Sequence, residues 1–575
     1  MKNIMGENKL FVKLQICIGL LNIIHPFIFA YMAKIIANNL ANPTKLIIYI
    51  CSLGIGLTFH QGILSYCTKM KDHMYAEIRF YCFRLVDKKA LKTPYEKMIS
   101  QPFQDTFKYC IDFVDDIENG LQAAVEHFFE LFTNLGLFVL YLTTVTFVDY
   151  LIPVFIIVIT IIDFISISRA EKYEYKNIND IKRIDNRIKT IEVNARQKEY
   201  VKDIKVYKAK PFFVSWYDNA ITQKVNIVWE TQKRYLRAYF SQSLLSVFRD
   251  TICYFYLIYQ LYLDTITLSD FVFLLAIITG FSGNIANVFA KLALIAKDKM
   301  GISELDNFLK EDQLDEKNKK TKVNISSQVS NIRFENVSYQ YDQAQEWALK
   351  DVSFEIAAGE HIGLVGLNGA GKTTLMLLLC GLLSPTKGNI YINNINIKDI
   401  SAEKYLDLFS VVFQDVNMLN FSIDENIRGI DQQNKNYDEF LEAFGMADLI
   451  QQLGKDKVLG KIFAEDGIEL SGGEKQKLAL VRALYKDAAV FILDEPMSAL
   501  DPLMEEKIIS NYKKLFKDKT SIHISHRLSS TRLCDKIFLL NNGCLVEKGT
   551  HEELMKMQGE YCKLFVAQQE SYGLL

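Results

Sequence analysis

The sequence predicts an α-helical membrane domain followed by a soluble α/β domain that binds a phosphate compound. Three observations support this. Six apolar stretches, each long enough to cross a bilayer, lie in the first half of the 575-residue chain. A glycine-rich loop with a lysine occupies Gly366–Thr373. Two carboxylates, Asp494 and Glu495, end an apolar run. A chain of this length is expected to form two or more domains.

The overall composition excludes some partners and favours a reducing environment. The formal net charge is −2, so bulk charge gives no support to nucleic-acid binding, and no nucleic-acid partner is expected. The ten cysteines are scattered without a CxxC pair. They are therefore interpreted as free thiols in a reducing cytosol or in membrane helices.

The six apolar stretches are expected to be transmembrane helices in contact with membrane lipids. They lie near Leu10–Ile36, Leu46–Tyr66, Phe128–Phe147, Leu151–Ile167, Ser243–Leu263 and Leu268–Phe289. The start "MKNIMGENKLFVKLQ" lacks a clean signal-peptide cleavage pattern, so the first stretch is interpreted as a retained span. Lysine and arginine are concentrated in the two long connections. The positive-inside rule then places both termini and both connections in the cytoplasm.

The long connections, Lys69–Glu126 and Arg169–Arg237, have polar sequences with helical apolar spacing. They are predicted to continue the membrane helices into the cytoplasm. Each contains a proline-bearing break, at Thr93–Asp105 and at Lys208–Asn219. A short transverse element is expected at each break, at the tip of a helical hairpin.

Several ionisable residues fall inside the predicted spans. They are His25, His60, Asp163, Arg249 and Asp250. Charges inside a bilayer usually face protein or a watery cavity. Two interpretations stay open: pairing between helices, or lining of a substrate path.

The composition changes after the last span. We expect a transmembrane domain at residues 1–310, a charged linker at 311–330 and a nucleotide-binding domain at 331–575. "IRFENVSYQY" and "LKDVSFEI" alternate like strands at the start of the last domain.

The glycine-rich loop matches the phosphate-binding pattern G-x-x-x-x-G-K-[ST], with a strand expected before it and an apolar helix after it. Its backbone N–H groups are expected to wrap the phosphates of ATP, with Lys372 on the β- and γ-phosphates and Thr373 on Mg²⁺. The residues expected to bind the nucleotide here are Gly366, Asn368, Gly369, Ala370, Gly371, Lys372, Thr373 and Thr374.

The run "AAVFILDEP" reads as a buried parallel strand that ends in two carboxylates. Asp494 suits the Mg²⁺ shell. Glu495 suits a general base or water-orienting group for attack on the γ-phosphate.

A second phosphate-facing helix start is expected at "ELSGGEKQKLALVRAL", Glu469–Leu484. Two adjacent glycines in the first turn weaken a helix by roughly 1 kcal/mol each relative to alanine. In return they leave bare backbone N–H groups at the positive helix end, which is an anion site.

The phosphate loop, "LSGGE" and "FILDE", in this order, resemble the nucleotide-binding domain of an ABC transporter. With six spans before that domain, the whole chain resembles an ABC exporter half-transporter. The resemblance implies six transmembrane helices with long cytoplasmic extensions, followed by an α/β P-loop NTPase domain of ABC type.

The resemblance also implies roles for individual residues. Tyr341 would stack on adenine, Gln414 would touch Mg²⁺ or the attacking water, and His526 would hold the γ-phosphate. The acid of "SALD" is Asp501. In this family two nucleotide domains dimerise head to tail. Ser471, Gly472 and Gly473 would therefore contact ATP held by a partner chain, expected to be identical.

The breaks at Thr93–Asp105 and Lys208–Asn219 resemble exporter coupling helices. They would dock on the nucleotide domains near Gln414. Closure of those domains would then switch the membrane cavity from inward- to outward-facing.

Three sequence features favour export of a peptide, such as a modified peptide or a bacteriocin. They are the short run before the signature, the loop "GLNGAGKTTL", and "YEKMISQPFQD", which resembles the first loop of lantibiotic exporters. The alternatives are a lipid or multidrug exporter and an ATP-gated channel or sensor. The first span starts near Leu10, so an N-terminal peptidase is not expected. The expected location is the bacterial cytoplasmic membrane.

Overall fold

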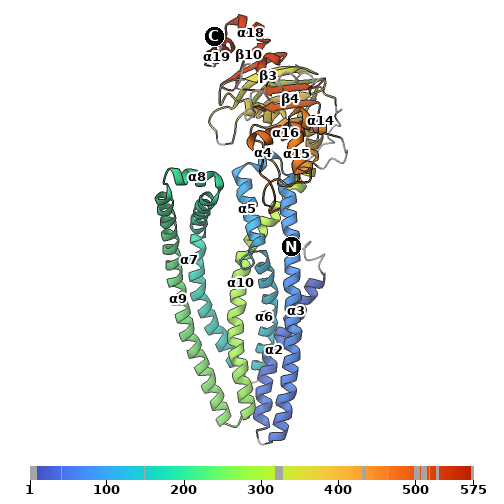
Figure 1. The fold of residues 1–575 in the computed structure, drawn as a ribbon. Coiled ribbons are helices and arrows are strands. Elements are labelled where there is room, and N and C mark those ends of the chain that lie inside the picture. The colour runs from blue at the N-terminus through green and yellow to red at the C-terminus, as the bar shows by residue number, and fades with distance from the viewer. Residues whose placement is uncertain are drawn as a thin grey trace. The chain divides into compact units, whose positions relative to one another are not determined.

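The computed structural model consists of two compact units. One contains Met1–Lys92 and Gln104–Glu311, and the other contains Thr93–Phe103 and Asp312–Leu575. The structure describes residues 9–40, 42–147, 149–317, 325, 328–342, 344–429, 436–462, 464–497, 506, 515–516, 518–525 and 530–571. The first unit is helical, and the second is built on two β-sheets (Figure 1).

Long helices make up the first unit. They are α2 (Lys9–Asn38), α3 (Pro43–Lys92), α5 (Gln101–Asp115), α6 (Leu121–Thr146), α7 (Leu151–Arg196), α8 (Lys198–Val206), α9 (Lys210–Tyr262) and α10 (Leu268–Lys317). Helices α7 and α9 run side by side as a hairpin, and α2 packs on α3 and α6. Many large apolar side chains on these helices face outward, such as Ile55 and Phe59 at 72% exposure. An apolar surface of this kind suits a membrane.

Within the described residues, five helices have the length and hydropathy needed to cross a membrane: α2, α3, α6, and parts of α7 and α10. The sixth predicted span, Ser243–Leu263, lies in α9 and is not among them. Arg249 and Asp250 are adjacent in this stretch, and their two charges lower its mean hydropathy. The Arg249 Nε atom donates to Asp250 Oδ1 at 3.0 Å, so the two charges compensate each other.

The two hairpin tips differ from each other. The first break contains the short helix α4 (Tyr95–Met98) between the end of α3 and the start of α5. At the second tip the chain breaks at residues 207–209, which overlaps the start of the predicted break at Lys208–Asn219, but the transverse element predicted within that range is wrong. The short helix there is α8, which precedes Lys208, and Pro211 lies in the first turn of α9. Proline is tolerated at a helix start because the N–H that it lacks would have no partner there.

The second unit has a six-stranded and a four-stranded sheet. The strands are β1 (Asn331–Tyr339), β2 (Leu349–Ala357), β3 (His361–Val365), β4 (Lys387–Ile392), β5 (Ile395–Asn396), β6 (Phe409–Val412), β7 (Val490–Asp494), β8 (Thr520–Ile524), β9 (Lys536–Asn541) and β10 (Cys544–Gly549). The orders are β10-β9-β3-β8-β7-β6 and β2-β1-β4-β5. The second sheet is antiparallel.

Helices accompany these strands. They are α11 (Lys372–Leu379), α12 (Ala402–Leu406), α13 (Ile423–Arg428), α14 (Asp438–Ala443), α15 (Ala447–Leu453), α16 (Gly472–Lys486), α18 (His551–Met557) and α19 (Glu560–Ser571), with 3-10 turns η1 (Ile397–Asp399) and η2 (Ser530–Leu533). Strands β7 and β8 are buried along their whole length, because layers cover both faces of the sheet.

Strands β3, β8 and β7 are parallel neighbours in the six-stranded sheet. Their carboxyl ends therefore meet at one edge. The glycine-rich loop follows β3, and the carboxylates Asp494 and Glu495 come at the end of β7. The topology thus brings together two motifs that lie more than a hundred residues apart in sequence.

Candidate functional site

The glycine-rich loop between β3 and α11 needs its glycines for backbone reasons. Gly366, Gly369 and Gly371 have φ values of +156°, +78° and +102°. A Cβ on Gly366 would lie 2.4 Å from the Leu540 carbonyl oxygen, and one on Gly371 would lie 2.7 Å from the Ala348 oxygen. Larger residues would disrupt the loop, which leads directly into the N-terminus of α11.

The Lys372 ammonium group lies under the loop. Its Nζ donates to the carbonyl oxygens of Gly366 at 2.8 Å and Leu367 at 3.1 Å. Burial lowers the pKa of Lys372, while Asp494 and Glu495 act in the opposite direction. A buried cation at a helix N-terminus, beneath a glycine loop, is a strong arrangement for binding a polyphosphate.

Asp494 is the more buried of the two carboxylates, with 4% of its surface exposed. Burial raises its pKa to about 6, and the neighbouring Glu495 and Asp415 add to the rise, whereas Lys372 lowers it. The site therefore holds an excess of negative charge beside the lysine. A divalent cation would relieve this excess.

The pKa of Asp494 makes the stability of the empty protein depend on pH. Its folded value of about 6 exceeds the ordinary value of 3.8, so the folded protein binds this proton more tightly than the unfolded chain. The stability that this proton contributes at low pH is lost as the pH rises from about 4 to about 6, by on the order of 3 kcal/mol. We expect Asp494→Asn to raise the melting temperature at pH 7.5 but not at pH 4.5.

Thermal unfolding of the nucleotide-free protein in detergent, across this pH range, measures the effect. Glu346→Gln, which removes an exposed carboxylate of the same unit, serves as the control and should leave the pH profile unchanged. Equal melting temperatures for Asp494→Asn and the unaltered protein at every pH would contradict the assignment.

Hydrogen bonds from the backbone and from side chains hold Glu495 in place, and among the described residues they include the following. Its N–H donates to the Ile524 carbonyl oxygen at 3.0 Å, and its carbonyl oxygen accepts from Gln476 Nε2 at 3.0 Å. Its side-chain Oε2 accepts from Gln414 Nε2 at 3.3 Å. The backbone has a φ of +47°, which is costly for a residue with a side chain. Such strain persists only where neighbouring contacts support it, and it is typical of functional positions.

Gln476 is a site residue that sequence reasoning missed. It lies in α16 with 3% exposure and connects that helix to the backbone of Glu495. The one available signal was a polar residue on the apolar face of a helix. Gln414, by contrast, was predicted, and its amide lies beside Glu495 as described above.

Tyr341 lies next to the first turn of α11. Its hydroxyl is 3.1 Å from Thr374 Oγ1, and its ring contacts Tyr339 edge to face with centroids 5.0 Å apart. The ring is 38% exposed, so one side remains open to a ligand. Asn368, Gly369 and Thr373 are exposed on the same loop and helix start, while Ala370 and Thr374 are buried.

The second predicted anion site is the N-terminus of α16. Ser471 caps this helix: its Oγ accepts from the Glu474 N–H, and Glu474 Oε2 accepts from the Ser471 N–H at 2.7 Å. Ser471 and Gly472 are exposed, and a Cβ on Gly472 would meet no atom within 4 Å. The chain's own packing does not require this glycine. It leaves open space over backbone N–H groups, where an outside anion could approach.

Among the helices that the structure describes, three share this capping box, which offers a matched test of the role of Ser471. Ser422 caps α13 in the same way, with Glu425 as its partner. We expect Ser471→Ala and Ser422→Ala each to cost about 1 kcal/mol in stability. Only Ser471→Ala is expected to lower ATP turnover, by roughly tenfold, because a lost hydrogen bond to a charged phosphate is worth about 1.5–3 kcal/mol.

Chemical or thermal unfolding and ATPase rates measured on the same preparations separate the two effects. Equal ATPase losses in the two variants would assign Ser471 a capping role alone. Thr550, which caps α18 with Glu553, gives a third variant for calibration.

Two predicted residues, His526 and Asp501, lie outside the described residues. Gly473 is in the first turn of α16, next to Gly472. The structure thus brings together the loop, Lys372, Asp494, Glu495, Gln414 and Tyr341, all at the carboxyl edge of the six-stranded sheet or at the start of α11.

The oxygen donors at this edge fit Mg²⁺. Thr373 supplies an exposed hydroxyl, Asp494 a buried carboxylate with a raised pKa, and Gln414 an amide oxygen. Among the residues that the structure describes, no group of three or more His, Cys, Asp or Glu side chains could hold a metal alone. Magnesium often uses one or two protein ligands and completes its shell with phosphate oxygens and water, so these donors are sufficient.

The ionisable residues of the apolar helices have partners of different kinds. The His25 and His60 rings lie 5.3 Å apart, and His60 Nε2 is 3.1 Å from the Leu21 carbonyl oxygen. Arg249 pairs with Asp250, as described above. Asp163 and Arg249 are 3% and 6% exposed, and within the described residues Asp163 Oδ1 is buried without a hydrogen bond. The contacts of His60 and Arg249 favour pairing within the bundle, whereas Asp163 decides between neither interpretation.

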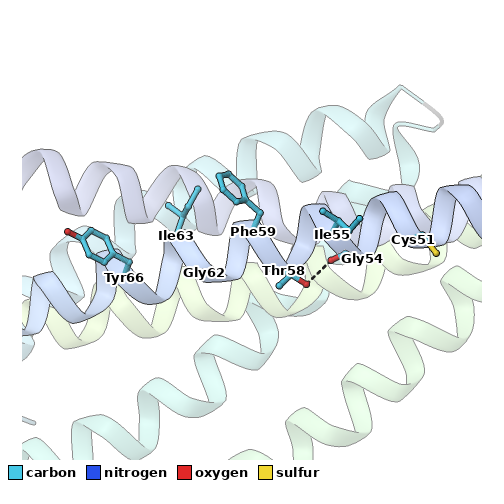
Figure 2. A pocket seen from close by; sticks show the side chains of 8 residues that line it. All are labelled: Cys51, Gly54, Ile55, Thr58, Phe59, Gly62, Ile63 and Tyr66. Carbon is cyan, nitrogen blue, oxygen red and sulfur yellow. Dashed lines mark hydrogen bonds between the residues drawn. The ribbon is translucent and has the colours of Figure 1, made fainter.

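One hollow on the helical unit lies on α3. It has a volume of about 980 Å³ and is lined by eight residues of that one helix (Figure 2). Gly54, Thr58 and Gly62 recur at intervals of four along it, and the Thr58 hydroxyl donates to the Gly54 carbonyl oxygen at 2.8 Å. Because no second described element contributes to its lining, this hollow is a groove on a helix surface and not an enclosed ligand site.

Comparison with known proteins places this geometry in context. Residues 349–498 match the family model described as "ABC transporter". The chain is 34% identical over 297 residues to the "Subtilin transport ATP-binding protein SpaT" of Bacillus subtilis, covering 50% of this chain and 46% of that protein. It is 38% identical over 237 residues to an "ATP-dependent lipid A-core flippase" of Methylobacillus flagellatus, covering 41% and 40% of the two chains.

These alignments span less than half the length of each curated relative. A solved structure described as "a bacterial Atm1-family ABC exporter with ATP bound" matches much more of the fold. Its TM-score is 0.78 at 19% identity, and the match covers 98% of both chains. The predicted fold class is thereby confirmed.

Proposed function

The chain has the fold of an ABC exporter, a membrane domain fused to one nucleotide-binding domain, and from this premise we propose that it hydrolyses ATP to export a substrate. The location is the bacterial cytoplasmic membrane, with the nucleotide-binding domain and both termini in the cytoplasm. The proposal rests on one observation: Lys372, Asp494, Glu495 and Gln414 lie together at the carboxyl edge of the six-stranded sheet.

Each residue at this edge has a task that follows from its position. Lys372 exchanges its two loop carbonyl acceptors for phosphate oxygens when ATP binds. Glu495 orients the attacking water and accepts its proton, while the Gln414 amide, 3.3 Å from Glu495, helps to position that water. His526 and Asp501 complete the site in this proposal. Magnesium held by Thr373, Asp494 and Gln414 would neutralise charge on the β- and γ-phosphates.

The exposed start of α16 supports a site shared between two identical chains. Ser471, Gly472 and Gly473 would contact the ATP held by the phosphate loop of the partner. Tyr341 would stack on the adenine of the ATP held by the loop of its own chain. The open space over Gly472 supports this arrangement, because packing within its own chain does not require a glycine at this position. ATP then links the two domains, and hydrolysis releases them.

The substrate that we propose is a peptide, either modified or of the bacteriocin type. The similarity to a subtilin transport protein supports this class, together with the first-loop sequence "YEKMISQPFQD". A lipid is the second candidate, because the similarity to a lipid A-core flippase is of comparable strength. A channel or sensor that moves no substrate would show ATPase activity without accumulation of any substrate.

The first hairpin tip supports coupling between ATP and transport. Glu96 of α4 belongs to the same compact unit as the sheets. Its Oε1 accepts from the Tyr339 hydroxyl at 3.3 Å, and its Oε2 accepts from the Ser384 N–H at 3.2 Å. The Glu96 carboxylate raises the pKa of Tyr339, as does burial, so the tyrosine remains a donor. Tyr339 is two residues from Tyr341, the proposed adenine partner.

Glu96→Ala tests this coupling, and with it the proposed function. We expect the variant to retain ATPase activity within about threefold but to lose at least 80% of ATP-dependent peptide accumulation, because the two hydrogen bonds of the Glu96 carboxylate described above are lost. The assay uses inside-out proteoliposomes and a dye-labelled candidate precursor peptide. Glu118→Ala, an exposed acid of the same connection, should retain both activities.

Transport that persists at full rate in Glu96→Ala would refute coupling through this tip. Absence of accumulation in the unaltered protein for peptides and lipids alike, with ATPase activity intact, would favour the channel or sensor.

A further inference from the structure

A partly open polar cavity of about 440 Å³ lies in the helical unit and is lined by residues of α2, α3, α6 and α10. Its volume is within the range of sites for small ligands. Unlike the groove on α3, it is lined from four helices. All of its lining residues belong to the same compact unit. Most of them carry a polar or charged side chain, which is unusual among helices of this hydropathy.

Two ion pairs cross the cavity. Lys71 of α3 lies 3.1 Å from Glu126, and Lys291 of α10 lies 2.5 Å from Glu130. The two glutamates are one helical turn apart on α6, so they face the same side of that helix. Each is neutralised by a lysine from a different helix. The cavity therefore carries two charges of each sign and no net charge from these four residues.

Side-chain amides supply the next layer of polar groups. Gln15 Nε2 donates to the Tyr75 hydroxyl at 2.8 Å, and Asn134 Nδ2 donates to the Glu130 carbonyl oxygen at 2.8 Å. Asn22 and Asn287 also line the cavity. An amide side chain offers both donors and an acceptor, which is the same combination that a peptide backbone presents.

A second, apolar cavity of about 340 Å³ adjoins the first between α2 and α6. Its lining includes Phe128, Phe132 and Leu20, and the two cavities share Gln15, Gly19, Phe129 and Thr133. The wall between them is thin because a Cβ on Gly19 would lie 2.8 Å from Thr133 Oγ1. A polar and an apolar compartment thus share one wall.

We infer that the two cavities form one binding site for an amphipathic peptide segment with free charged groups. Lys71 and Lys291 would pair with a carboxylate, and Glu126 and Glu130 with an ammonium group. The amides would meet the peptide backbone, and an aromatic or aliphatic side chain would enter the apolar compartment. The inference rests on the proposed export function and names the chemistry of its substrate.

The balance of charge favours a peptide over an anionic lipid. Two glutamates one turn apart would repel a phosphate headgroup unless both lysines faced it at once. A zwitterionic ligand instead exchanges each internal ion pair for an equivalent one, so no charge is left uncompensated. The amide layer adds hydrogen bonds that a phosphate headgroup with acyl chains could not fully use.

Peptide binding without nucleotide tests the inference separately from ATP hydrolysis. The probe is a dye-labelled hexapeptide with free termini and two phenylalanines, and binding to the full-length protein in nanodiscs is followed by fluorescence anisotropy. Unlabelled competitors are the same peptide, a form with acetylated and amidated termini, a form with serines in place of phenylalanines, and lysophosphatidylethanolamine. Proteins compared are the unaltered chain, Glu130→Gln, Phe132→Ala and Lys224→Gln.

The expected result is a specific pattern of losses. Blocked termini should weaken competition about tenfold in the unaltered protein and clearly less in Glu130→Gln, because one of the groups that pair with the charged termini is already gone. Serine replacement should weaken competition about tenfold in the unaltered protein but not in Phe132→Ala. Lys224→Gln, which breaks the ion pair with Asp185 on the α7–α9 hairpin, should keep both differences.

Equal competition by free and blocked peptides in the unaltered protein would overturn the inference. Stronger competition by lysophosphatidylethanolamine than by the peptide would overturn it in favour of a lipid site. Binding with the expected pattern in a protein that lacks ATPase activity would support the site and refute the export function alone. Absence of probe binding in an active ATPase would overturn the binding site and leave the ATPase part of the proposed function standing.

Discussion

Glu495→Gln is expected to lower ATP turnover by about 10²–10⁴-fold while ATP binding is retained. This is the range that a positioned general base contributes. The amide that replaces the carboxylate is nearly the same size, so the bonds from Gln476 and to Ile524, which involve only the backbone, remain. Steady-state phosphate release from protein in lipid, and binding of a fluorescent ATP analogue, measure the two properties.

Asp415→Asn is the matched control for this prediction. Asp415 acts on Asp494 through its charge, as Glu495 does, and so tests loss of negative charge without loss of the proposed base. It should change turnover by less than about threefold. A Glu495→Gln protein with near-normal turnover would remove Glu495 from the reaction and leave its strained backbone without a catalytic explanation.

Mixed dimers are expected to regain activity when each chain carries a different defect. Lys372→Ala disables the phosphate loop, and Gly472→Glu places a carboxylate over the exposed start of α16, where the chain itself has room for it. Alone, each variant should lose at least 95% of ATP turnover, because a removed or opposed charge at a phosphate is worth several kcal/mol. In the mixed dimer, the intact loop of one chain meets the intact helix start of the other, so one site works.

Two differently tagged chains, co-expressed and purified through both tags, allow this measurement. A dimer of one unaltered chain and one Lys372→Ala chain shows how much a single intact site can do. Turnover of the doubly defective dimer should equal about that value. Turnover as low as in the two parent variants, beside an active reference dimer, would mean that the site is built within one chain.

The two nucleotide motifs could be predicted because each is encoded locally. A loop at Gly366–Thr373 with three positive φ values tolerates few residues but glycine, so its pattern is recognisable in isolation. The buried strand before Asp494 is equally distinctive. Their meeting at one edge follows from β8 lying between β3 and β7, and this depends on strand order, which short spacings do not encode.

Gln476 could not be predicted for a related reason. Its partner is the backbone carbonyl oxygen of Glu495, and every residue type has such an acceptor, so the sequence does not indicate the contact. Pro211 misled in the opposite direction, since proline both interrupts helices and starts them. The transverse helix α8 begins earlier, after a break at Gln197, whose extended backbone, with ψ of 133°, ends α7 without a glycine or proline.

The single helix α3 has a mechanical consequence. It continues for 50 residues from Pro43 to Lys92, and the 30 residues after Gly62 contain neither glycine nor proline. At 1.5 Å per residue this part is a stiff lever of about 45 Å, and the glycines at Gly54, Gly56 and Gly62 offer a pivot near its far end. A swing of about 5° at that pivot would move Lys92 by about 4 Å. Small rearrangements near the glycines would therefore become displacements comparable to a helical turn beside α4.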